Sequence, residues 1–117
     1  MKYTINEQFN CVVIELKGDV VGGPHAVEFR EDLHELIDQG KTNIIINLGK
    51  VKFMNSSGLG ILISALTTVK KADGRLVISE ANKKIDSLLM TTQLNKVFEN
   101  YSTLEEAKDS FQQKTTD

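Results

Sequence analysis

The hydrophobic pattern of the chain changes repeatedly between the period of a strand and the period of a helix. Alternating apolar residues predict a hairpin of two strands near 2–7 and 11–16, joined by a polar turn at 8–10. Short β-branched runs at 43–48 and 75–78 have the length and composition of buried strands. Apolar residues that recur every three or four positions predict amphipathic helices at about 24–39, 56–72, 83–92 and 104–111.

This order of elements predicts the fold class. After the hairpin, helices and strands alternate, and residues 97–98 are the only candidate for a last strand. Right-handed crossovers then require a mostly parallel, mixed sheet with the helices packed against it. We therefore expect a single α/β domain over 1–117 with an N-terminal hairpin and about four α-helices, in which 112–117 form a frayed tail.

One stretch, residues 51–62, carries the main candidate for chemistry. It joins a buried strand to a helix whose predicted core stripe is Leu59, Leu62, Ile63, Leu66 and Val69. Three consecutive residues, Asn55, Ser56 and Ser57, are good helix caps, and Gly58 and Gly60 allow another backbone to come close. Helix capping alone would explain the two hydroxyls. The free N–H groups at such a helix start would also stabilise an added anion, for which phosphate is the natural candidate.

Residues 53–60 resemble the signature of STAS domains, specifically that of the bacterial anti-sigma factor antagonists. That family usually reads aspartate, serine, serine or threonine, glycine, leucine, glycine at this place. The resemblance continues at Gly18, which we expect to close the second strand, and in the helix at 85–94. Together with chain length and element order, it covers nearly the whole chain.

The resemblance implies a phosphorylation switch at Ser56. The unphosphorylated protein would bind an anti-sigma factor that is also an ATP-dependent serine kinase, and would thereby free a sigma factor. The kinase would then phosphorylate Ser56, and a serine phosphatase would reset the cycle. ATP belongs to the partner in this scheme, so we expect no cofactor and no enzymatic activity of the chain itself.

Several residues around Ser56 are expected to contact the partner. Asn55 stands where the family has aspartate, and the flexible loop at 18–23 is richer in glycine than is usual in the family. On the helix, Ile61 and Ala65 lie beside the core stripe, either as a wider stripe under a neighbouring helix or as an exposed apolar patch. The expected partner-binding residues are Asn55, Ser57, Gly58, Gly60, Ile61, Ala65, Gly22 and Gly23.

Composition and charge exclude several other functions. The formal net charge is −2, and no basic stripe with interleaved aromatics is present, so we expect no nucleic-acid partner. The longest apolar stretch is far shorter than the ~20 residues of a membrane span, and no apolar signal region is found near Met1, so we expect a cytoplasmic protein without membrane contact. The single Cys11 fits a reduced thiol in a strand.

Enzyme and metal chemistry find little support. A serine hydrolase would need a base for Ser56 or Ser57, but the chain has only His25 and His34 and no Gly-x-Ser-x-Gly elbow. The same two histidines and Cys11 lack the spacing of metal ligands. The main rival is a STAS domain of another class, such as a signalling scaffold or an accessory subunit of a transport system, with no phosphorylation cycle.

Overall fold

The computed structural model describes residues 1–112. The elements are, in order, β1 (Lys2–Glu7), β2 (Val12–Val20), α1 (Pro24–Asp38), β3 (Asn43–Met54), α2 (Ser56–Lys71), β4 (Arg75–Ser79), α3 (Lys83–Thr91), the 3-10 helix η1 (Leu94–Lys96), β5 (Glu99–Tyr101) and α4 (Leu104–Gln112).

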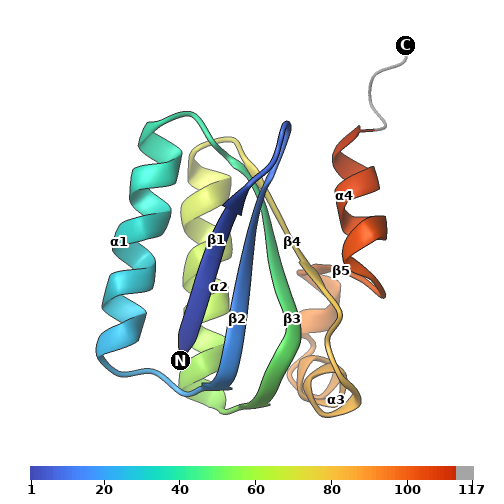
Figure 1. The fold of residues 1–117 in the computed structure, drawn as a ribbon. Helices are drawn as coiled ribbons and strands as arrows, with labels where there is room; N and C mark the ends of the chain where they lie inside the picture. The colour runs from blue at the N-terminus through green and yellow to red at the C-terminus, as the bar shows by residue number, and fades with distance from the viewer. Residues whose placement is uncertain (113–117) are drawn as a thin grey trace.

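The five strands form one sheet in the order β1-β2-β3-β4-β5, in which β1 is antiparallel to β2 and the other pairs are parallel. Figure 1 shows α1 and α2 side by side on one face of the sheet and α4 on the other. Apolar residues of α1, α2 and α3 share one buried cluster with the sheet, and α4 closes a second, smaller cluster. The predicted α/β fold with an N-terminal hairpin is therefore confirmed.

The second cluster contains the single cysteine. Cys11 is free and buried one residue before β2, where it packs with residues of β2, β3, β4 and α4. Burial raises the pKa of the Cys11 thiol, because the thiolate would lose its solvation. Its side chain thus behaves as a small core residue.

Two strands are longer than their hydrophobic runs predicted. We expected strands that end at residues 16 and 48, whereas β2 continues to Val20 and β3 to Met54. The added residues pair with each other, Gly18 with Val51 and Val20 with Met54, across two shifts of register. Gly18 has a φ of 79°, which glycine adopts without strain, so the irregular pairing passes through it and the loop begins only after Val20.

The end of the chain also differs from the prediction. The last strand is Glu99–Tyr101 and not 97–98, because Phe98 turns into the core before the chain pairs with β4. Helix α4 is capped by Thr103, whose Oγ1 accepts a hydrogen bond from the Glu106 N–H at 3.1 Å. Gln112 is the last residue of this helix, and the rest of the expected frayed tail lies outside the described residues.

The buried stripe of α2 is rotated relative to the prediction. Ile63 was expected in the core but is 39% exposed, whereas Ala65, which we considered for an exposed patch, is only 3% exposed. Helix α2 packs against α1 as well as the sheet, so its buried arc widens toward α1. Of the two alternatives for Ala65, the wider stripe under a neighbouring helix is therefore correct and the exposed patch is wrong.

We expect Ala65→Glu to destabilise the fold strongly, by on the order of 3 kcal/mol, because it buries a carboxylate without a partner. Ser64→Glu is the matched control, since Ser64 is exposed on the same turn and its replacement should change stability by less than about 0.5 kcal/mol. Chemical denaturation of both variants measures the difference. Similar midpoints for the two would place residue 65 at the surface.

Candidate functional site

The candidate site lies where β2 and β3 end at the same edge of the sheet. Residues 21–23 lead from β2 into α1, and Asn55 alone joins β3 to α2. Figure 1 shows these two connections next to each other at the lower edge of the molecule. The Asn55 N–H approaches the Val20 carbonyl oxygen at 3.4 Å, so the two segments, far apart in the sequence, meet here.

Asn55 is the cap of α2. Its side-chain Oδ1 accepts a hydrogen bond from the Gly58 N–H at 2.9 Å, and its carbonyl oxygen accepts one from the Leu59 N–H, also at 2.9 Å. The helix begins at Ser56, so Ser57 already lies inside the first turn. Of the three candidate caps, the structure therefore selects Asn55, and the capping role that we considered for Ser57 is wrong.

Ser56 is exposed as the first residue of α2. Asn55 satisfies two of the N–H groups of the first turn, whereas those of Ser56 and Ser57 have no hydrogen-bond partner within residues 1–112. Free N–H groups and the positive end of the helix dipole lie next to the Ser56 hydroxyl. An anion attached to this hydroxyl would thus gain hydrogen-bond donors that are unused in the described chain.

The glycines of the site differ in what surrounds them. A Cβ atom on Gly58 would lie 1.8 Å from the Val20 carbonyl oxygen, so α2 can approach the end of β2 only because this residue has no side chain. A Cβ atom on Gly22 would lie 3.4 Å from the Ser57 Cβ, which places the loop beside the start of α2. Gly60 has open space around it, and Gly23 is exposed with a φ of 101°.

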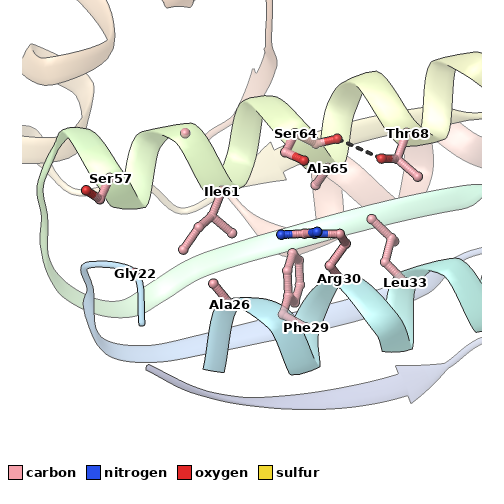
Figure 2. Close-up of a pocket in the computed structure, with 11 residues that line it drawn as sticks. Gly22, Ala26, Phe29, Arg30, Leu33, Ser57, Ile61, Ser64, Ala65 and Thr68 are labelled. Atoms are coloured by element: carbon pink, nitrogen blue, oxygen red, sulfur yellow. Dashed lines mark hydrogen bonds between the residues drawn. The ribbon is translucent and has the colours of Figure 1, made fainter. Parts of the chain in front are cut away.

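A groove of about 270 Å³ begins near the starts of α1 and α2 and extends along the space between the two helices. Its α2 side includes four residues of the expected partner site, Ser57, Gly60, Ile61 and Ala65, and Gly22 lies at the same end as Ser57 (Figure 2). The expected partner-binding set did not include the other lining residues: Ala26, Phe29, Arg30, Leu33, Ser64 and Thr68. Ala26, Phe29 and Leu33 recur at helical spacing in the sequence, but nothing in the pattern indicates which helix they face.

A second hollow of about 300 Å³ lies on the other side of the motif. It is lined mainly by apolar atoms of Phe53 and Met54, at the end of β3, and of α3 residues including Leu88. Phe53 is half exposed, and Val21 in the adjoining loop is also exposed, although less than Phe53. Apolar surface is thus exposed in the segment that precedes Ser56 and in the adjoining loop, which is typical of a protein interface.

The fold and the motif at the start of α2 are those of a known domain family. The family model of the STAS domain matches residues 2–107, nearly the whole chain. The chain belongs to the STAS domain family.

Several relatives of this STAS domain are each described as a "putative anti-sigma factor antagonist". This STAS domain is 25% identical over 80 residues to a "putative anti-sigma factor antagonist" of Thermotoga maritima. The matched region covers 68% of this chain and 71% of the relative. A crystal structure of a protein with that description from the same organism has a TM-score of 0.85 at 20% identity, over 95% of both chains. The phosphorylated form of SpoIIAA, a cell fate determinant of Bacillus, has a TM-score of 0.73 at 25% identity, over 93% of this chain and 98% of that one. The predicted family resemblance is confirmed.

The two histidines of this STAS domain lie apart from the groove. His25 is exposed near the start of α1, where its Nδ1 lies 3.5 Å from Glu28, and it lines a shallow depression beside β1. His34 is exposed on α1. Within residues 1–112, no three metal-ligating side chains form a cluster, and no helix is long and apolar enough to cross a membrane.

Asn55 is the position where this STAS domain departs from the aspartate usual in the family. We expect Asn55→Asp to keep the cap, because a carboxylate also accepts the Gly58 N–H, and to favour the helix start by a few tenths of a kcal/mol. Asn55→Ala should lose about 1 kcal/mol of stability.

The same Asn55→Asp change should disfavour a phosphate on Ser56, because two anions would then share one helix start. Phosphorylation should become weaker, or loss of the phosphate faster, as followed by intact-mass spectrometry over time. Asn55→Ala serves as the control for a weakened cap without added charge. Equal phosphorylation of the aspartate variant and the unmodified protein would show that residue 55 does not tune the phosphate.

Proposed function

We propose that this STAS domain is an anti-sigma factor antagonist that is switched by phosphorylation of Ser56. In the unphosphorylated state it binds an anti-sigma factor that is also an ATP-dependent serine kinase, and this binding frees a sigma factor. Phosphorylation of Ser56 separates the complex, and a serine phosphatase restores the first state. The protein acts in the cytoplasm as a binding module, with no catalysis, cofactor, nucleic acid or membrane of its own.

One observation carries this proposal. The serine that corresponds to the phosphorylated position of the family motif is exposed, begins a helix and has unused N–H groups beside it. The description of the relatives as anti-sigma factor antagonists supports the class of partner, and the phosphorylated SpoIIAA structure supports a phosphorylated state for this fold. Ser56 is exposed, which supports its access to a kinase.

Release follows from the surroundings of Ser56. A phosphoserine carries about −1.5 to −2 charges at neutral pH and holds a shell of water. The next residue, Ser57, lies beside Gly22 and lines the groove between α1 and α2, and the half-exposed Phe53 precedes Ser56 by three residues. We expect this apolar surface to lose its water when a partner packs against it. A phosphate would have to lose its water inside that interface, so the complex with the phosphorylated form is the weaker one.

The experiment combines the protein with the serine kinases of the anti-sigma factor class encoded in its own genome. Each kinase is incubated with the protein and ATP, and the phosphate is located by peptide mass spectrometry. Binding is measured by calorimetry before and after phosphorylation. We expect one kinase to bind the unmodified protein tightly, to place one phosphate on Ser56 and then to release it. A phosphate on Ser57 alone, or the absence of any binding kinase, would overturn the proposal.

A further inference from the structure

We propose that the groove between α1 and α2 receives an apolar segment of the kinase partner that carries a carboxylate, and that Arg30 binds this carboxylate. The inference rests on the proposed function and adds to it the surface on which the partner lies and the charge that the partner must present. Figure 2 shows the groove, with Ser57 toward one end, Thr68 toward the other and Arg30 between them.

The floor of the groove is apolar and already packed. Phe29 and Leu33 of α1 and Ala65 of α2 are buried and belong to the core, while Ile61 is partly buried against the same core. These side chains form an apolar strip between the two helices, and the hydroxyls of Ser57 and Ser64 lie along its rim. A strip of this kind fits apolar side chains of an extended or helical segment, with polar contacts at the edges.

Among the residues that the structure describes, Arg30 is the only charged one that lines the groove. Its side chain reaches from α1 into the space between the helices, as Figure 2 shows, and it takes part in none of the ion pairs found within residues 1–112. A partner that covers the strip would take this guanidinium out of water. An unpaired cation in an interface is costly, so a partner that binds well must supply an anion.

The groove favours a protein carboxylate over other anions. A phosphate or nucleic-acid backbone would call for several cations, whereas the lining offers one cation among apolar side chains, and the chain as a whole has a net charge of −2. A guanidinium matches a single carboxylate with two parallel hydrogen bonds. The complementary surface is therefore an apolar segment that bears an Asp or Glu.

The position of the groove connects it to the switch. Ser57 and Gly22 line the groove, and Ser57 directly follows the serine that we propose as the phosphorylation site. A partner segment that lies on Arg30 and continues along the groove therefore reaches the start of α2. A phosphate on Ser56 would add negative charge next to an acidic segment, so repulsion would act together with desolvation to separate the complex.

The test uses the kinase identified by its phosphorylation of Ser56, with affinity measured by calorimetry in the absence of ATP. We expect Arg30→Gln to weaken binding about tenfold and Arg30→Glu about a hundredfold, while the thermal midpoint stays unchanged, because Arg30 is exposed and has no ion pair to lose. Lys71→Gln is the matched control, an exposed cation on α2 outside the groove, and it should bind like the unmodified protein.

Two further measurements distinguish charge pairing from a change of shape. The affinity of the unmodified protein should fall more steeply with salt than that of Arg30→Gln. Arg30→Glu should regain binding to a kinase variant in which one acidic residue is replaced by Arg. Binding of Arg30→Glu that equals that of the unmodified protein, with Ser56 still phosphorylated, would overturn the groove assignment and leave the proposed function intact. If no kinase binds or phosphorylates Ser56, both proposals fail.

Discussion

Ser56→Asp is expected to weaken binding of the kinase partner by on the order of a hundredfold, whereas Ser56→Ala should bind the partner with or without ATP. The aspartate adds one negative charge at an exposed position next to apolar surface, and that charge must lose its water when the partner docks. The alanine variant loses one hydroxyl, which makes no packing contact in the core. Without this hydroxyl the variant cannot accept a phosphate. Calorimetric titration of both variants measures the difference.

Ser57→Ala is the control for this experiment. Because the cap of α2 is the Asn55 side chain, the loss of the Ser57 hydroxyl should change stability by less than about 0.5 kcal/mol and leave phosphorylation in place. The Ser57 hydroxyl lies beside the groove, so a small change of affinity is compatible with the proposal. Equal binding by the alanine and aspartate variants of residue 56 would remove Ser56 from the interface.

Gly58→Ala is expected to destabilise the protein by about 3 kcal/mol, although alanine is the better helix former. Intrinsic propensity favours alanine over glycine within a helix by about 1 kcal/mol. The added Cβ atom, however, would lie 1.8 Å from the Val20 carbonyl oxygen and 3.0 Å from the Met54 Cγ. The start of α2 would have to move away from the ends of β2 and β3, and overpacking of this kind costs more than the propensity gains.

Gly60→Ala is the matched control, because Gly60 lies two residues further along the same helix with nothing within 4 Å of an added Cβ. It should stabilise the fold by about 0.5–1 kcal/mol, as propensity alone predicts. Urea denaturation of the two variants gives the free energies of unfolding. A stabilised Gly58→Ala protein would show that β2 and α2 are not in contact at this glycine.

Much of the arrangement follows from the sequence because it depends on local pattern. The β-branched run at 44–46 and the helical spacing of Leu59, Leu62 and Leu66 determine a strand followed by a helix. Once the elements alternate, the handedness of crossovers leaves few topologies, and the mostly parallel sheet with its hairpin is one of them. The polar residues between this strand and this helix are also a local pattern, and they place the candidate site at the carboxyl end of β3.

Only the tertiary structure decided which residues do what at that site. Asn55, Ser56 and Ser57 are equally good caps in isolation, and the helix starts after Asn55 because β3 pairs with β2 as far as Met54. Ala65 and Ile63 are both apolar, but α1 covers one and not the other. Arg30 reads as a surface residue in the sequence, and the packing of α1 against α2 places it in a groove. Local spacing determines where elements form, whereas the contacts between elements far apart in the chain determine which side chains are buried, capped or left to bind a partner.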